Sequence, residues 1–107
     1  GENIYPREVE DTLYEHQGVL DCAVLGQPDD QWGEMVTAFI VTKDLTLQES
    51  DLETWCKNSD TLANYKRPRR YIFCNELPRN ASGKIQKFLL RKQLEESADD
   101  KSMGNLL

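Results

Sequence analysis

The segment Met35–Thr42 is apolar on both of the faces that it would have as a β-strand. The two faces consist of Val36, Ala38 and Ile40 and of Met35, Phe39 and Val41. A strand with two apolar faces is buried on both sides, so it lies inside a sheet whose faces are both covered. The pattern therefore predicts a sheet with this strand at its centre.

Two further strands and three helices are predicted around this central strand. Pro6 suits the first turn of a helix that Gly18 ends, and Thr46 with Glu49 has the spacing of a capping box. The other expected elements are strand Val19–Leu25 with the turn Gly26–Asp30, a helix to about Lys57, strand Arg70–Cys74 and helix Lys87–Glu96. This order predicts an α+β domain in which helices pack on a small three-stranded sheet.

The inner faces of two helices and the extent of the domain also follow from the pattern. Leu52, Trp55 and Cys56 are expected to face the core in the second helix, and Leu90 and Leu94 in the last. The length of 107 residues fits one domain, which we expect over residues 1–96. Residues 97–107 have little apolar content and are expected to form a disordered tail.

Membrane-spanning, collagen-like and wholly disordered chains are excluded by the same pattern. No apolar run approaches the roughly 20 residues that a membrane span needs. No signal peptide opens the sequence, and we expect a chain that starts at Gly1 within a patterned segment to be the end of a longer protein. The ending Asn105–Leu107 is not a peroxisomal signal, so a cytoplasmic location is expected.

The cysteines and the single histidine give no sign of a metal or disulfide site. Cys22, Cys56 and Cys74 are widely and unequally spaced, each within an apolar stretch. They form no pair or cluster with zinc-ligand spacing, so we expect buried free thiols and no metal site. His16 stands alone near a helix end, where a capping or surface role is expected.

The charges are distributed unevenly along the chain. The net charge is −6, yet the segment Lys66–Lys92 has nine basic residues and one acidic residue, Glu76. This segment therefore carries +8 and the remainder −14. Such a patch indicates either a polyanionic ligand or a solvated basic face paired with acidic helices of the same domain.

The loop Pro78–Ile85 displays Lys84 just ahead of the last helix. It does not match a P-loop, because Pro78 stands where that motif needs Gly and Ile85 where it needs Ser or Thr. Lys84 is either a mobile cation for oxygens that gain charge in a transition state or an ordinary surface lysine. The loop alone does not decide between these.

Aromatic side chains accompany the basic ones in two other segments. Around Pro68 an extended backbone would direct Tyr65, Arg67 and Arg69 to one side, which suits a phosphorylated nucleotide. The alternative is a basic edge strand that resists aggregation. Trp32, in the predicted turn between two strands, is either a stacking platform or a side chain that folds back onto the core.

Four segments, in order and at compatible spacing, resemble motifs of the C-terminal domain of adenylate-forming acyl-CoA synthetases. Gly1–Pro6 resembles G-G-E-N-I-Y-P without its first glycine, and Asp29–Glu34 resembles D-x-x-W-G-E. Tyr65–Pro68 matches Y/F-K-x-P, and Leu77–Lys84 matches L-P-[KR]-[NT]-x-x-G-K. The resemblance covers residues 1 to about 96 and is nearest to aryl and medium-chain acyl-CoA ligases.

The resemblance implies the mobile lid of an ATP-dependent carboxylic acid:CoA ligase, an enzyme that is active only as part of a longer chain. Such an enzyme first forms an acyl-adenylate with release of pyrophosphate, and Lys84 is implied as the catalytic residue of this step. The lid then rotates, and CoA accepts the acyl group. ATP with Mg²⁺, the acyl pocket and the hinge are implied to belong to the large N-terminal domain, which is the expected partner.

The second step would use the opposite face of the domain. By resemblance, Gly1 lies at the tunnel for the CoA thiol, Trp32 and Tyr65 lie near the CoA nucleotide, and Arg67 and Arg69 hold its phosphates. An alternative is an adenylation domain that delivers its acyl group to a carrier protein. A nucleic-acid-binding module is not expected, because the chain is acidic overall and has no repeated aromatic platform.

Overall fold

The computed structural model describes residues 6–29, 33–59, 62 and 67–102, as helices, strands and the connections between them. The chain divides into two compact units, Gly1–Leu77 and Pro78–Leu107, which are described separately. This boundary lies inside the 1–96 domain expected from the sequence. The first unit contains the sheet and two helices, and the second contains a loop followed by one helix.

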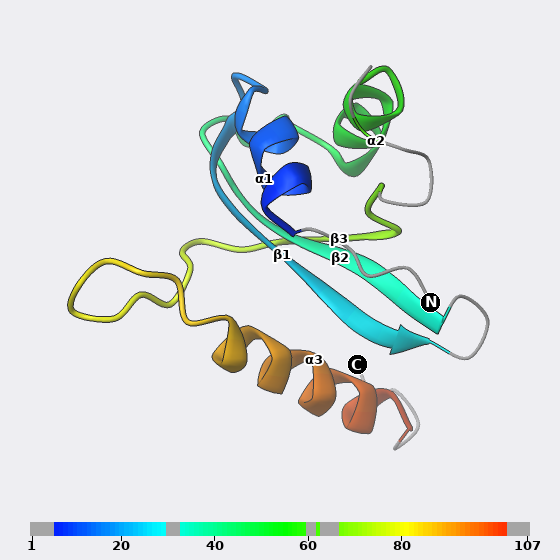
Figure 1. Ribbon diagram of the computed structural model, residues 1–107, viewed down its shortest axis with the longest axis vertical. Helices are drawn as coiled ribbons and strands as arrows, with labels where there is room; N and C mark the ends of the chain where they lie inside the picture. Colours follow the sequence, from blue (N-terminus) through cyan, green and yellow to red (C-terminus); the bar gives the residue numbers. More distant parts are fainter. Residues whose placement is uncertain (1–5, 30–32, 60–61, 63–66, 103–107) are drawn as a thin grey trace. The chain divides into compact units, whose positions relative to one another are not determined.

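The sheet of the first unit has three strands in the order β1-β2-β3 (Figure 1). β1 is Val19–Asp29, β2 is Gly33–Thr42 and β3 is Arg70–Phe73. β1 pairs with β2 antiparallel, whereas β3 pairs with β2 parallel. The central position predicted for the strand at 35–42 is therefore confirmed.

Both faces of β2 are buried, as its two-sided apolar pattern predicted. On one face Ala38 and Ile40 are 0% exposed, and on the other Phe39 is 2% and Val41 is 6% exposed. The first of these faces shares its core with helices α1, Pro6–Tyr14, and α2, Glu49–Lys57. That core consists of Val9, Leu13, Val19, Cys22, Val24, Val36, Ala38, Ile40, Leu52, Cys56 and Leu62.

The β1–β2 hairpin is longer than the sequence predicted. We expected a turn from Gly26, but β1 continues to Asp29, with Pro28 paired to Glu34. Proline lacks the N–H that a central strand needs, yet β1 is an edge strand and tolerates it. The predicted turn over Gly26–Asp30 is therefore wrong up to Asp29.

Helix α2 begins differently from the expected capping box. Its N-cap is Gln48 rather than Thr46, and the Asp51 carboxylate accepts a hydrogen bond of 2.8 Å from the Gln48 backbone N–H. The Thr46 N–H instead donates to the Asp44 carboxylate at 2.9 Å. The Thr46–Glu49 box was wrong because the helix starts two residues later than expected, so that Asp51 and not Glu49 occupies the third helical position.

The predicted inner face of α2 is confirmed for two of its three residues. Leu52 and Cys56 are 0% exposed, but Trp55 retains 38% of its surface exposed. The Trp55 indole N–H donates to the Thr12 carbonyl at 2.8 Å, and the His16 ring lies edge-on to it at 4.9 Å. Trp55 therefore connects α2 to α1 at the border of the core, because its indole N–H needs a polar partner.

The second unit consists of the loop 78–86 and helix α3, Lys87–Ser102, drawn in yellow to red in Figure 1. Leu90 and Leu94 are each 2% exposed, as expected for the inward face of this helix. The expected end at Glu96 was too early, because residues 97–102 are helical in the segment predicted as a disordered tail. Residues 97–102 contain no Gly or Pro, so no helix-breaking residue interrupts this part of α3. Residues 103–107 lie outside the described residues.

Candidate functional site

Lys84 is exposed in the loop 78–86, which is drawn in yellow ahead of α3 in Figure 1. Arg79 and Ile85 pair in a single antiparallel bridge, and the Gln86 N–H donates to the Pro78 carbonyl at 2.9 Å. The loop therefore closes on itself immediately before α3 begins at Lys87. The structure therefore presents an exposed Lys84 from a closed loop just ahead of the helix, and its catalytic role stays a prediction.

The Asn80 side chain organises the inside of this loop. Its Oδ1 accepts hydrogen bonds from the Ser82 N–H at 3.0 Å, the Ser82 hydroxyl at 2.9 Å and the Lys84 N–H at 2.9 Å. The Asn80 N–H also donates to the Lys84 carbonyl at 2.9 Å. Sequence analysis assigned Asn80 no role, although an Asn two residues before Ser in a polar loop is a known signal for side-chain-to-backbone turns.

Gly83 and Arg79 complete the turn. Gly83 has φ of 85°, a backbone conformation that residues with a Cβ adopt only at a cost. Its N–H donates to the Asn80 carbonyl at 2.9 Å, and the Arg79 Nη1 donates to the Gly83 carbonyl at 2.6 Å. The backbone preceding Lys84 is therefore fixed by both main-chain and side-chain contacts.

In the other unit, Arg67 and Arg69 line one small hollow of about 90 Å³. Arg67 is half-buried and Arg69 exposed, and the Arg69 N–H donates to the Val36 carbonyl at 2.8 Å, just before β3 begins. The hollow also contains Glu49 and Glu53 of α2. The structure thus brings two of the predicted binding residues together and places two carboxylates beside them.

Tyr71 also lines this hollow, and its hydroxyl interacts with the Cys56 thiol. Burial raises the pKa of the Cys56 thiol and that of the Tyr71 hydroxyl, and the nearby Arg67 guanidinium acts in the opposite direction on both pKa values. Because burial dominates, both groups stay protonated at neutral pH, and Cys56 is no activated nucleophile. The charges at the hollow are therefore those of the arginines and the glutamates.

Three predicted site residues, Gly1, Trp32 and Tyr65, lie outside the described residues. The predicted thiols are confirmed in part, since Cys22 and Cys56 are buried and unbridged whereas Cys74 is only half-buried. Among the residues that the structure describes, no three or more His, Cys, Asp or Glu side chains cluster as metal ligands would. Within the same part of the chain, no helix combines the length and apolarity needed to cross a membrane.

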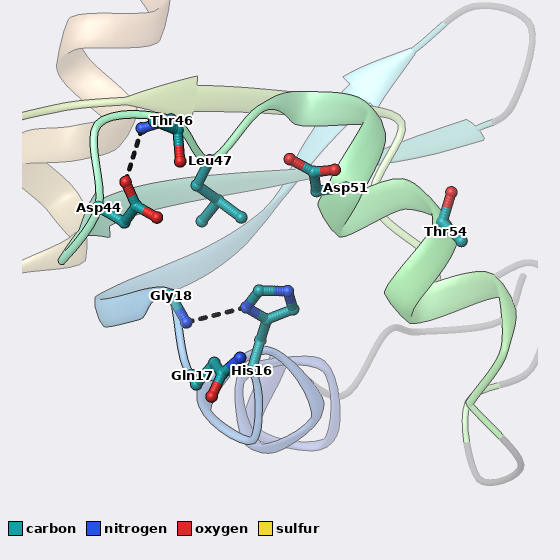
Figure 2. A pocket seen from close by; sticks show the side chains of 8 residues that line it. All are labelled: His16, Gln17, Gly18, Asp44, Thr46, Leu47, Asp51 and Thr54. Carbon is teal, nitrogen blue, oxygen red and sulfur yellow. Dashed lines mark hydrogen bonds between the residues drawn. The ribbon is translucent and has the colours of Figure 1, made fainter.

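A second hollow of about 400 Å³ lies between the end of α1 and the start of α2 (Figure 2). His16 points into it, and its Nδ1 accepts a hydrogen bond of 3.0 Å from the Gly18 N–H. Asp44 and Asp51 lie on the opposite wall, but no predicted site residue lines this hollow. This contact holds the turn that follows α1, but an accepting nitrogen does not cap the carbonyl groups at the end of a helix, so the expected capping role stays a prediction.

Comparison with known proteins gives a family and several relatives. The family model described as AMP-binding enzyme C-terminal domain matches residues 8–84. A 4-chlorobenzoate–CoA ligase from an Arthrobacter species is 46% identical over 99 residues, which are 92% of this chain and 19% of that protein. The chain therefore spans about a fifth of the length of this relative.

Comparison with solved structures also finds CoA synthetases. A fatty acyl CoA synthetase from Mycobacterium tuberculosis matches with a TM-score of 0.83 and 39% identity, over 91% of this chain and 19% of that one. The o-succinylbenzoate CoA synthetase of Bacillus subtilis, solved in complex with an acyl-adenylate intermediate, matches with a TM-score of 0.77 and 39% identity. That match covers 84% of this chain and 18% of the synthetase.

Proposed function

The chain belongs to the AMP-binding enzyme C-terminal domain family, and on that basis we propose that it is the lid of an ATP-dependent carboxylic acid:CoA ligase. In the first reaction, a carboxylate oxygen of the acid attacks the α-phosphorus of ATP. The bond to pyrophosphate breaks, and an acyl-adenylate is formed. In the second reaction, the CoA thiol gives up its proton to solvent and its sulfur attacks the acyl carbonyl. The bond between the acyl carbon and the AMP oxygen breaks, and AMP leaves with the former carboxylate oxygen.

The observation that carries this proposal is the presentation of Lys84 by a closed loop. The first reaction brings a carboxylate to a triphosphate, so negative charges approach one another. A cation held in place beforehand offsets this repulsion and costs no reorganisation when the reaction occurs. Lys84 is exposed, and Asn80 and Gly83 fix its backbone, so its ammonium group can supply that charge.

Arg67 and Arg69 are proposed to bind the phosphates of CoA. A guanidinium forms paired hydrogen bonds with phosphate oxygens, and two of them line one hollow here. The carboxylates of Glu49 and Glu53 partly offset the positive charge in this hollow. Phosphate binding is therefore most favourable where the phosphate oxygens contact the guanidinium groups directly. Gly1, Trp32 and Tyr65 stay proposed contacts of the thiol tunnel and the nucleotide.

The remaining groups are proposed to belong to the rest of a longer enzyme. We propose that a large N-terminal domain holds ATP with its Mg²⁺ ion and the pocket for the acid. The cationic residues described here fit phosphate oxygens rather than a metal ion. The relatives and neighbours compared above are named as CoA ligases or synthetases, which supports free CoA over a carrier protein as the acceptor.

The test uses the full-length protein that contains this chain, with a panel of aromatic and aliphatic carboxylic acids. Acid-dependent exchange of pyrophosphate into ATP, followed by CoA-dependent thioester formation, is expected. Lys84→Ala should slow the exchange about 100- to 1,000-fold, while thioester formation from preformed acyl-adenylate continues. Lys92→Ala, which removes an exposed lysine of α3, is the matched control and should leave both reactions unchanged.

Each outcome bears on a different part of the proposal. No exchange with any acid would refute the ligase, and exchange without use of CoA would move the acceptor to a carrier protein. Equal loss of both reactions in Lys84→Ala would refute the assignment of Lys84 to the first reaction alone.

A further inference from the structure

Both backbone hydrogen-bonding groups of Lys84 are bound by one residue, Asn80. The Lys84 N–H donates to the Asn80 Oδ1 and the Lys84 carbonyl accepts from the Asn80 N–H, each at 2.9 Å. In a regular antiparallel pair, the backbone carbonyl of the partner would accept the first of these bonds. Here the Asn80 carbonyl accepts from the Gly83 N–H, and the Asn80 side chain takes over its function.

This arrangement gives the Asn80 side-chain amide one of the two hydrogen bonds that hold the Lys84 backbone. The direction in which the Lys84 side chain leaves the loop is set by its backbone, and that backbone is held on both sides by Asn80. The same Oδ1 also accepts two hydrogen bonds from Ser82, which fix the tip of the loop. Removal of the amide would leave the Ser82 and Lys84 N–H groups without this acceptor while Lys84 itself is retained.

We propose that Asn80 is the positioning residue for Lys84 in acyl-adenylate formation, an inference that rests on the proposed function. Asn80 touches no reacting atom in this assignment and acts through the lysine backbone. A displacement of about 1 Å at a reacting group reduces the rate about 100-fold. Loss of the Asn80 acceptor should therefore slow the first reaction although every charged group of the site remains.

The experiment compares three variants of the full-length enzyme. Asn80→Ala removes the acceptor, Asn80→Asp keeps an oxygen at the same place, and Asn75→Ala changes an exposed asparagine outside the loop. The first readout is pyrophosphate exchange beside thioester formation from preformed acyl-adenylate. The second is hydrogen–deuterium exchange of the Ser82 and Lys84 amides, which needs no activity.

We expect Asn80→Ala to slow pyrophosphate exchange about 100-fold, to leave thioester formation unchanged and to accelerate amide exchange at both positions. Asn80→Asp should restore most of the rate and the amide protection, and Asn75→Ala should resemble the wild type. A role limited to overall stability would instead lower both reactions together, and that result would overturn the proposal.

The failure of this inference is distinguishable from failure of the proposed function. If pyrophosphate exchange requires Lys84 but is normal in Asn80→Ala, the inference about Asn80 is wrong and the ligase function stands. Unchanged amide exchange in Asn80→Ala would overturn the inference whatever the activity. If the wild-type enzyme shows no pyrophosphate exchange with any acid, both the function and the positioning role are refuted.

Discussion

Gly83→Ala tests how far the backbone conformation of the Lys84 loop matters, without adding a steric clash at that position. Gly83 has φ of 85°, and a Cβ built there would meet no other atom within 4 Å. Gly83→Ala therefore introduces no clash within the described residues, and its cost is that of the backbone conformation. For a residue with a Cβ, this cost is about 1–2 kcal/mol.

That cost sets the expected effect on adenylation. A free energy of 1–2 kcal/mol changes a conformational ratio by a factor of about 5–30. Pyrophosphate exchange by the full-length enzyme should therefore fall by at most about 30-fold in Gly83→Ala, less than in Lys84→Ala. Gly83→Asn is the matched control, because asparagine adopts positive φ more readily than alanine and should retain more of the rate.

Two results would refute this reasoning about Gly83. A larger loss in Gly83→Asn than in Gly83→Ala would mean that side-chain volume matters more than backbone conformation. An unchanged rate in Gly83→Ala would mean that the left-handed conformation at this position is not needed to present Lys84. Thioester formation from preformed acyl-adenylate, measured in the same variants, should stay at the wild-type rate.

Two further predictions concern the first unit. Arg67→Ala and Arg69→Ala should each raise the CoA concentration needed for half-maximal thioester formation about tenfold or more and leave pyrophosphate exchange intact. Arg91→Ala of α3 is the control. A normal CoA response in the first two variants would remove both arginines from the site. The Tyr14 hydroxyl donates to the Asp21 carboxylate, and burial, with this hydrogen bond, raises the pKa of Tyr14 from 10.0 to about 12. Because the folded pKa is the higher one, this group adds stability that is present below pH 10 and is lost as the pH rises through about 12. Ultraviolet titration of the wild type against Tyr14→Phe should show one tyrosine that ionises near pH 12, and ionisation near pH 10 would contradict the prediction.

The sheet could be predicted because its signals are periodic. The two apolar faces of the segment 35–42 indicate a strand that is covered on both faces, which β2 is, although the edge strand β1 also buries residues of both faces. The ends of the helices and strands were harder to predict, because neighbouring residues compete for the terminal positions. Asp51 rather than Glu49 reaches back to the N-cap of α2, and Pro28 continues β1 because β1 lies at the edge.

The sequence identified some residues of the candidate site and missed others. Lys84 follows from the motif in which it stands, and Arg67 and Arg69 follow from alternation along an extended segment. Asn80 was missed because its role consists of hydrogen bonds to backbone groups two and four residues away, which no periodic pattern records. The carboxylates of Glu49 and Glu53 were also missed, since the fold brings α2 to the arginines across a long stretch of chain.

The mixed pairing of the sheet has a consequence for the kinetics of folding. β1 and β2 are consecutive and join through a short connection, so their pairing closes a small loop at little entropic cost. β3 pairs with the same central strand only after the chain has crossed over residues 43–69, which include α2. Local contacts form faster than contacts between distant residues, so we expect the hairpin to form first and β3 to dock on it late. Arg67 and Arg69 directly precede this late strand, so we expect them to reach their final positions late as well.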